Sequence, residues 1–277
     1  STSGAMSTSI PPALINYFNY DKGVHIELRG FYTDSQWEDL VYSQLALGPV
    51  IYDGQSNSGG HSFVCDGYDG EGYFHFNWGW GGLSDGYFLL SALDPESQGI
   101  GGSTSGFDFM QDIIAGIQPP VEGSQYVEQV FCGEGVYSND DMTSLGGRLS
   151  IAGNYFNYSA ITLKGMTLGA HIVGPDDYDS YLEAKRADMP SLYGTSEITV
   201  TLPEDLAEGT YYITPVFKTA TSDGWQPVRI PPVGPQALKM VVEGTLCFLS
   251  SIDYAEVVVS DLVELSPIHA YSPFKTA

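Results

Sequence analysis

The chain has 277 residues, of which 43% are hydrophobic and 16% are charged, so it is long enough for two separately cored domains and is not disordered in composition. Ten lysine and arginine residues against 34 aspartate and glutamate residues give a formal net charge of -24 at pH 7. A field of this sign repels phosphate backbones and anionic headgroups, which argues against nucleic acid as a partner.

The first third of the chain predicts helices followed by strands. Ser9 can cap a short helix in IPPALINYF, whose prolines are tolerated in a first turn. Thr33 and Gln36 make a capping box before a second helix, which ends at Gly48. Strands follow in VIYDG, HSFVCD, GYFHFNW, DGYFLLSAL and DIIAGI, with glycine-rich connections. This order predicts an α+β domain over residues 1–118.

The sequence pattern of the rest of the chain predicts an all-β structure. Short alternating strands bounded by turns are predicted in GRLSIAGNYFNYS, SEITVTLP, EGTYYITPVFK and QALKMVVEG. We therefore expect an immunoglobulin-like β-sandwich over residues 119–250. Residues 251–277 are predicted to form further strands or the start of another module.

The termini and the cysteines give few constraints. Cys65, Cys132 and Cys247 are too few for a disulfide framework, and their odd number leaves at least one thiol free within the chain. No apolar run approaches the about 20 residues needed to span a bilayer. The opening STSGAMSTS has neither the basic start nor the apolar core of a signal peptide, and it does not begin with methionine. We expect a processed piece of a longer precursor.

Most of the candidate chemistry lies in the stretch GGHSFVCDGYDGEGYFHFNWGWGG. A hairpin centred near Asp69 pairs residues whose numbers sum to about 138, so His61 is predicted to face Asn77. Opposed side chains have Cβ atoms about 4.5–5.5 Å apart, close enough for a hydrogen bond. A histidine oriented by an asparagine is the base that a cysteine nucleophile needs.

The cysteine of the same stretch does not fit the role of nucleophile. Cys65 lies four residues along the strand from His61, which is about 13 Å at about 3.3 Å per residue. This separation is far outside hydrogen-bond reach, so Cys65 is predicted to be a small buried residue.

The residues around the predicted pair favour a substrate site. Gly59 and Gly60 remove side chains just before His61, which would let an extended substrate approach. Trp78 is placed to shield the histidine–asparagine bond from water, and Trp80 to stack nearby.

Other interpretations of this stretch remain open. His75 is a rival base, although it would oppose Phe63 and find no orienting amide there. A histidine–asparagine pair alone also serves as a structural hydrogen bond, and the two tryptophans would equally suit an aromatic platform that binds carbohydrate.

An extended form of the stretch, GGHSFVCDGYDGEGYFHFNWGWGGLSDGYFLLSALDP, resembles the segment around the histidine of the streptopain-like secreted bacterial cysteine peptidases. The similarity runs back through ALINYFNYDKGVHIELRGFYTDSQWEDL to STSGAMSTS and forward to IIAGI, so it covers about residues 1–118. It implies a papain-like fold, of which this chain holds the antiparallel-sheet half.

The resemblance also implies roles for individual positions. His61 would be the catalytic base and Asn77 its orienting partner. The implied wall of the active site consists of Trp78 as a shield, Trp80 beside it, Gly60 with its backbone groups, and Thr2 and Ala5 in the pocket for an apolar substrate residue.

One part of the family's active site has no counterpart here. The nucleophilic cysteine and the glutamine of the oxyanion hole belong to an N-terminal segment that would precede Ser1. Cys132 and Cys247 do not replace that cysteine, because both fall in the predicted sandwich. We therefore expect an obligate partner, the N-terminal catalytic fragment of the same precursor.

The leading hypothesis is thus a secreted or cell-surface cysteine endopeptidase that cleaves protein or peptide substrates through a thioester, without metal or other cofactor and without a membrane span. The sandwich would be an accessory module. The alternative is a non-catalytic adhesin or pseudoenzyme that uses the same fold for binding.

Overall fold

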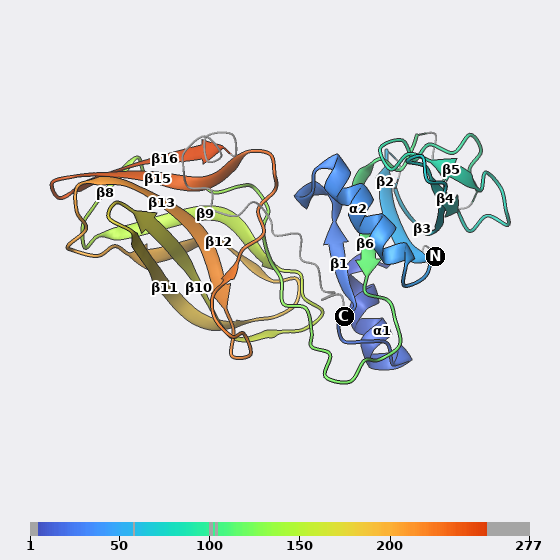
Figure 1. Cartoon of the computed structure of the whole chain (residues 1–277), viewed down its shortest axis with the longest axis horizontal. Coiled ribbons are helices and arrows are strands. Elements are labelled where there is room, and N and C mark those ends of the chain that lie inside the picture. Colours follow the sequence, from blue (N-terminus) through green and yellow to red (C-terminus); the bar gives the residue numbers. More distant parts are fainter. Residues whose placement is uncertain (1–4, 58, 100–101, 103–104, 254–277) are drawn as a thin grey trace. The chain divides into compact units, whose positions relative to one another are not determined.

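The computed structural model (Figure 1) describes residues 5–57, 59–99, 102 and 105–253. The chain divides into two compact units. The first comprises Ser1–Val127 with Ser159–Ile161, and the second comprises Glu128–Tyr158 with Thr162–Ala277.

The first unit is built on a six-stranded antiparallel sheet with the strand order β1-β6-β2-β3-β4-β5. Its elements are η1 (Ser7–Ser9), α1 (Ile10–Phe18), β1 (His25–Leu28), η2 (Arg29–Phe31), α2 (Asp34–Leu45), β2 (Val50–Ser56), β3 (Gly59–Tyr68), β4 (Phe74–Asn77), β5 (Gly86–Phe88) and β6 (Phe109–Ala115). The late strand β6 lies between β1 and β2, so residues far apart in sequence meet in the middle of the sheet.

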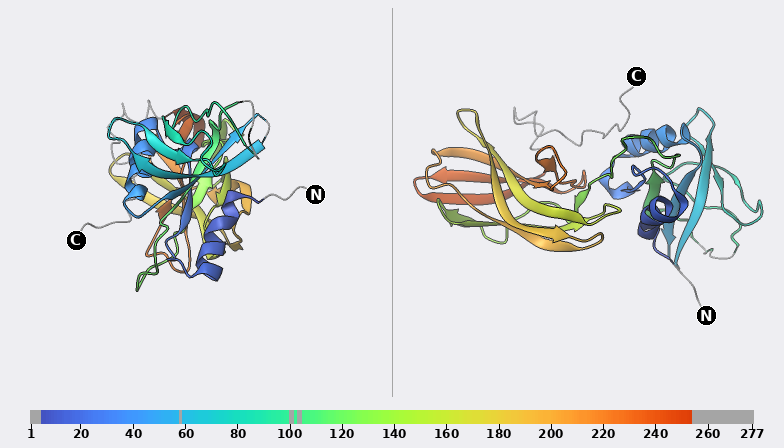
Figure 2. Two further views of the ribbon diagram at one scale, coloured as in Figure 1. Left: turned by 90° about the vertical axis from the view of Figure 1, so that its right-hand side faces the viewer. Right: turned by 90° about the horizontal axis from the view of Figure 1, so that it is seen from below.

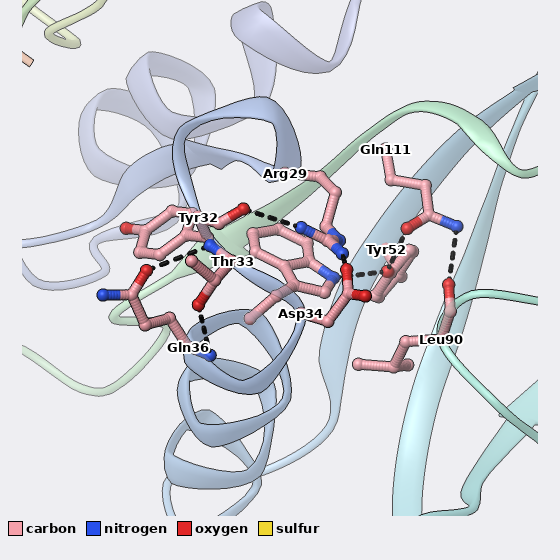
Figure 3. A network of polar contacts seen from close by, with 9 residues as sticks. Arg29, Tyr32, Thr33, Asp34, Gln36, Tyr52, Leu90 and Gln111 are labelled. Carbon is pink, nitrogen blue, oxygen red and sulfur yellow. Dashed lines mark hydrogen bonds and ion pairs between the residues drawn. The ribbon is translucent and has the colours of Figure 1, made fainter. Parts of the chain in front are cut away.

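The two predicted helices form, although only one is capped as predicted. The Thr33 hydroxyl accepts a hydrogen bond from the Gln36 backbone, and the Gln36 side chain accepts one from the Thr33 backbone, which confirms the capping box of α2 (Figure 3). Ser9 stands at the N-cap of α1, but its hydroxyl donates to the Met6 carbonyl and makes no capping bond, so the predicted cap is wrong.

The apolar core of the first unit lies between α2 and one face of the sheet. Trp37 and Val41 of α2 are fully buried against aromatic side chains of β2, β3 and β4. Because strand side chains alternate in direction, Tyr52 and Phe63 point into this core together with the side chain of Cys65. His61 belongs to the same face of β3, at the edge of the core.

A chain of buried hydrogen bonds crosses this core (Figure 3). The Trp37 indole donates to the Tyr52 hydroxyl at 2.7 Å, and that hydroxyl donates to the Gln111 side-chain carbonyl at 2.9 Å. The Gln111 amide then donates to the Leu90 carbonyl at 3.0 Å. Burial raises the pKa of Tyr52 well above its usual value, so this hydroxyl stays protonated and can donate.

Removing the central hydroxyl is expected to destabilise the first unit. In Tyr52→Phe, the Trp37 indole and the Gln111 carbonyl each lose a partner in the dry core, which costs about 1–3 kcal/mol for each group. The measurement is the free energy of unfolding in denaturant. Tyr87→Phe is the matched control, because Tyr87 is 56% exposed and its loss should cost less than about 0.5 kcal/mol. Equal losses in the two variants would contradict the prediction.

The second unit consists of a seven-stranded sheet and a three-stranded sheet. The larger has the order β11-β10-β13-β15-β16-β8 with β14 beside β13, and the smaller has the order β12-β9-β7. The strands are β7 (Val130–Cys132), β8 (Met142–Ser144), β9 (Arg148–Asn157), β10 (Leu163–Gly174), β11 (Tyr178–Met189), β12 (Gly194–Thr201), β13 (Gly209–Lys218), β14 (Gln226–Pro227), β15 (Pro235–Glu243) and β16 (Leu246–Asp253).

Buried side chains from both sheets, such as Ile151 of β9 and Ile172 of β10, form one continuous core, and the sheets of this unit face each other (Figure 2). The longest strand pair, β10 with β11, lies outside the strands expected from the sequence. The immunoglobulin-like assignment stays a prediction. Of the predicted last module, residues 254–277 lie outside the described part of the chain.

Candidate functional site

His61 lies on β3, but its strand neighbours differ from those predicted. On the β4 side, Val64 pairs with Asn77, so the predicted pairing of His61 with Asn77 is wrong. The main cause is the position of the turn, because Tyr68 pairs with Phe74 and the hairpin is therefore centred near residue 71 instead of Asp69. An irregularity between Cys65 and Gly67 changes the register by only one residue. On the β2 side, His61 pairs with Gly54.

The imidazole of His61 is held by a backbone carbonyl. Its Nε2 lies 2.8 Å from the carbonyl oxygen of Trp78, and because a carbonyl only accepts, Nε2 must carry the hydrogen. In the neutral ring the proton-accepting nitrogen is then Nδ1, which makes no hydrogen bond within the described residues. The ring is half-buried, so this nitrogen is presented as a base at the edge of the core.

Asn77 reaches the histidine indirectly. Its side-chain oxygen accepts a hydrogen bond from the Gly79 backbone N–H at 2.9 Å, a short turn typical of asparagine. That N–H belongs to the same peptide group as the Trp78 carbonyl. The Asn77 side chain therefore fixes the orientation of the peptide that holds His61. Gly79 has a φ of 77°, which favours glycine in this turn.

The two tryptophans have different positions. Trp80 stacks on His61, with ring centroids 4.9 Å apart and planes within 12° of each other. Trp78 is fully buried, and its indole donates to the Ser84 carbonyl at 3.1 Å. Its backbone N–H donates to Asp85 at 3.0 Å. Trp80, rather than Trp78, is thus the ring in face-to-face contact with the imidazole.

The remaining predicted residues have surroundings of their own. Gly60 pairs with Gln55, whose amide occupies the space that a side chain at Gly60 would need. Ala5 is exposed. Thr2 lies outside the described residues. His75 pairs with Gly67 rather than facing Phe63 as predicted.

His75 is also tied down elsewhere. Its Nδ1 lies 2.5 Å from a carboxylate oxygen of Asp66, and its ring meets the edge of Tyr87. This imidazole therefore has a structural partner of its own at the surface of the sheet.

Two residues of this site, Phe107 and Asp85, were not foreseen from the sequence. Phe107 lies 5.5 Å from the imidazole, ring centre to ring centre, and its backbone packs against Gly54 so closely that a side chain there would collide with it. Phe107 sits in an irregular segment without periodicity that could have indicated it. Asp85 accepts the hydrogen bond from the Trp78 backbone N–H. It follows a glycine-containing turn, and an aspartate in such a position could have predicted a side-chain to backbone hydrogen bond.

The three thiols are all buried and free. Burial raises the pKa of Cys65 to about 12 and that of Cys132 to about 11. It also raises the pKa of Cys247. The prediction that Cys65 is a packing residue is confirmed, since a thiolate is strongly disfavoured there.

The described residues contain no group of three or more histidine, cysteine, aspartate or glutamate side chains that could hold a metal ion. Over the same residues, none of the helices combines the length and the apolar character needed to cross a membrane.

Comparison with known proteins places this site in a family context. Residues 1–88 match the Peptidase C10 family. Streptopain of Streptococcus pyogenes serotype M1 is 42% identical over 120 residues, which are 43% of this chain and 30% of that protein. The thiol protease/hemagglutinin PrtT of Porphyromonas gingivalis is 42% identical over 118 residues, 42% of this chain and 14% of that protein.

A solved structure gives a further match. Active interpain A, a cysteine protease of Prevotella intermedia, is 36% identical, with a TM-score of 0.37, over 42% of this chain and 46% of that one. The predicted resemblance to streptopain-like cysteine peptidases is confirmed for the N-terminal part of the chain. The chain nevertheless spans less than a third of the length of its streptopain relatives.

Proposed function

We propose that the first unit is the histidine-bearing part of a streptopain-like cysteine endopeptidase with a papain-like fold. The observation that carries the proposal is the state of His61: Nε2 is engaged by the Trp78 carbonyl, Nδ1 is the basic nitrogen, and Trp80 stacks on the ring. This is the geometry of a general base whose tautomer is fixed by its surroundings. The identity of 42% to streptopain across this segment supports the same role.

The reaction needs a thiol that this chain does not offer. Cys65 is buried on the core face, with a pKa too high for a thiolate, and the other two cysteines belong to the second unit. We infer a cysteine on a separate N-terminal fragment of the same precursor. His61 Nδ1 would take the proton of that thiol as it attacks the peptide carbonyl, and would return it to the leaving amine as the thioester forms.

The setting of the enzyme is part of the same proposal. The related proteins are named streptopain and thiol protease/hemagglutinin, which favours a secreted or cell-surface peptidase acting on proteins or peptides. The second unit, with a core of its own, would serve as an accessory module. Thr2 and Ala5 would line the substrate pocket, as the family resemblance implies.

The cysteine-bearing fragment can be sought directly. Intact mass and N-terminal sequencing of the natively produced protein should reveal a second polypeptide that copurifies with this chain. A thiol-directed peptidase inhibitor should label a cysteine of that fragment and leave the cysteines of this chain unmodified. Labelling of Cys65 would refute the split enzyme by placing the reactive thiol in this chain. A folded chain that purifies alone, without any second polypeptide and without labelling, would favour the adhesin or pseudoenzyme.

The indirect role of Asn77 yields a specific prediction. Asn77→Ala removes the acceptor for the Gly79 N–H, so the Trp78 carbonyl becomes less well oriented, and we expect kcat to fall about tenfold, the effect of losing about 1.4 kcal/mol. Asn77→Ser should keep most of the activity, because a hydroxyl can accept the same turn bond.

The comparison separates the two possible roles of Asn77. A serine is too short to reach the imidazole directly, so a direct asparagine–histidine bond predicts that Asn77→Ser is as inactive as Asn77→Ala. The measurement is kcat and KM of the assembled two-chain enzyme with a fluorogenic peptide.

A further inference from the structure

Ser84 and Asp85 lie in the turn between β4 and β5, immediately before β5, and both contact Trp78. The Trp78 backbone N–H donates to Asp85 Oδ1 at 3.0 Å, and the Trp78 indole donates to the Ser84 carbonyl at 3.1 Å. Trp78 is also the residue whose carbonyl oxygen lies 2.8 Å from His61 Nε2. The turn therefore reaches the candidate base through a single residue.

Trp78 is held on both sides of its α-carbon. Asp85 binds the N–H of the peptide group that precedes Trp78, whereas Asn77 Oδ1 binds the Gly79 N–H, which belongs to the peptide group that follows it. Because the indole is fully buried and bonded to Ser84, the side chain cannot turn with the backbone. Planar peptide groups that are fixed at both ends leave the carbonyl between them one direction, which is toward the imidazole.

The Ser84 hydroxyl holds a second segment that reaches the site. It donates to the Ser97 carbonyl at 2.8 Å and accepts a hydrogen bond from the Ser97 backbone N–H at 3.2 Å. Gly99, two residues further on, packs so closely on Trp80 that an added Cβ would lie 2.6 Å from Cγ of the indole. Since Trp80 is the ring that stacks on His61, the segment 97–99 supports the second contact of the imidazole.

The backbone of Ser84 has an unfavourable conformation. Its φ is 59°, in the left-handed region that favours glycine over residues with a Cβ. A glycine would fit this backbone better, but it has no hydroxyl to bind Ser97. Strained residues persist where the surrounding contacts hold them, and they cluster at functional sites. The strain at Ser84 therefore points to a role for its hydroxyl.

We propose that Ser84 and Asp85 are positioning residues of the candidate peptidase site. Asp85 directs the Trp78 carbonyl at His61 Nε2, which leaves Nδ1 as the basic nitrogen. Ser84 holds the segment 97–99 against Trp80, which keeps that ring stacked on the imidazole. The inference rests on the proposed function of His61 as a general base, and both residues act through the tryptophans instead of on the reacting atoms.

The hydrogen bond at Asp85 requires an acceptor. Asp85→Asn keeps a side-chain carbonyl where the carboxylate oxygen stands, whereas Asp85→Ala removes the partner of the Trp78 N–H. We expect kcat of the proposed two-chain enzyme to fall about tenfold in Asp85→Ala, with KM little changed, and to stay within about threefold of the wild type in Asp85→Asn. A merely structural aspartate would lower Tm in Asp85→Ala and leave kcat of the folded enzyme unchanged.

The tautomer of His61 gives a readout that needs no activity. In the full chain labelled with ¹⁵N-histidine, at alkaline pH where the imidazole is neutral, the two ring nitrogens of His61 should have well-separated chemical shifts, because the hydrogen stays on Nε2. The two shifts should approach each other in Asp85→Ala, as the other tautomer becomes populated, and stay separated in Asp85→Asn. The signals are assigned by their absence in His61→Ala.

Asp69→Ala is the matched control. Asp69 is an exposed aspartate in the turn between β3 and β4, and its Oδ1 accepts hydrogen bonds from the backbone N–H groups of Glu71 and Tyr73. Its removal breaks turn bonds of the same kind that do not involve Trp78, so kcat and the shifts of His61 should stay as in the wild type. The role of Asp85 is overturned if Asp85→Ala leaves both quantities unchanged, or if Asp69→Ala alters them equally.

Ser84→Gly tests the hydroxyl separately and keeps the proposal open to refutation if Asp85→Ala folds poorly. Glycine relieves the left-handed backbone and retains the carbonyl that binds the Trp78 indole, so Tm should be no lower than in Ser84→Ala. We expect kcat to fall about two- to tenfold, because Trp80 is less well supported. Full kcat in Ser84→Gly would overturn the role of the hydroxyl.

The two readouts separate this inference from the proposed function. If the shifts of His61 respond as expected but the assembled protein cleaves no peptide, the proposed function is wrong and the orientation of the imidazole by Asp85 stands. If peptide cleavage depends on His61 but neither kcat nor the shifts respond to Asp85→Ala, the proposed function stands and the positioning role of Asp85 is wrong.

Discussion

Replacement of His61 by alanine is expected to lower kcat/KM of the proposed two-chain enzyme by about 10²–10⁴-fold, the usual contribution of a positioned general base. The variant loses the Nδ1 base, while the Trp78 carbonyl and the aromatic residues around the site remain. The thiol of the proposed partner fragment should then react with inhibitors only slowly near neutral pH, because no base removes its proton. Folding should be little affected, since the ring lies at the edge of the core.

His75→Ala is the matched control for this variant. His75 lies on the adjacent strand, is also half-buried, and is bonded to Asp66 rather than facing a free site. Its removal should leave kcat/KM within about twofold of the wild type, a change of less than about 0.5 kcal/mol. If His75→Ala abolished activity and His61→Ala did not, the assignment of the base would have to be reversed. The measurement is cleavage of a fluorogenic peptide across pH 5 to 9.

Substitution of the two tryptophans of the NWGWGG motif should affect different properties, folding stability for Trp78 and kcat for Trp80. Trp78→Ala removes a fully buried ring from the aromatic core and should cost about 3–5 kcal/mol of folding stability. Trp80→Ala removes a partly exposed ring that stacks on His61, an interaction worth about 0.5–1.5 kcal/mol. That variant should fold normally and lose about two- to tenfold in kcat.

Each tryptophan variant serves as the control for the other. Denaturant unfolding gives the stability, and kinetics of the assembled enzyme give kcat. The separation of roles fails if Trp80→Ala is as unstable as Trp78→Ala, because Trp80 would then be a core residue and its stacking on the imidazole incidental. The separation of roles also fails if the two variants are equally stable and lose the same amount of kcat.

Both helices and most strands of the first unit were predictable because their signals are local, although strand β1 was not expected. The capping box at Thr33 and Gln36 needs only four residues of sequence, and it is present as expected. The hairpin register was not predictable, because the glycine-rich loop does not mark its own centre: Tyr68 pairs with Phe74, so the turn is centred near residue 71 instead of Asp69. The sequence therefore identifies His61 and Asn77 as belonging to one site, while their connection through the Trp78–Gly79 peptide required coordinates.

Contacts between residues far apart in the chain could not be predicted from the sequence for a different reason. Asp53 and Asp112 are 59 positions apart and meet only because β6 inserts beside β2. In the second unit, strand β11 has charged residues throughout YDSYLEAKRADM and lies at the edge of its sheet, so its alternation carries little apolar signal. Such strands are recognised from their partners rather than from their own composition.

The acceptor that engages His61 is a main-chain carbonyl, and this affects how the site can change through mutation. Every amino acid at position 78 supplies that same oxygen, so no single codon change there deletes it. Substitutions at position 78 would be selected for how they fill the core, not for hydrogen bonding to the imidazole. Substitutions of Asn77 or Gly79, in contrast, would change the turn that orients the Trp78 carbonyl toward the imidazole.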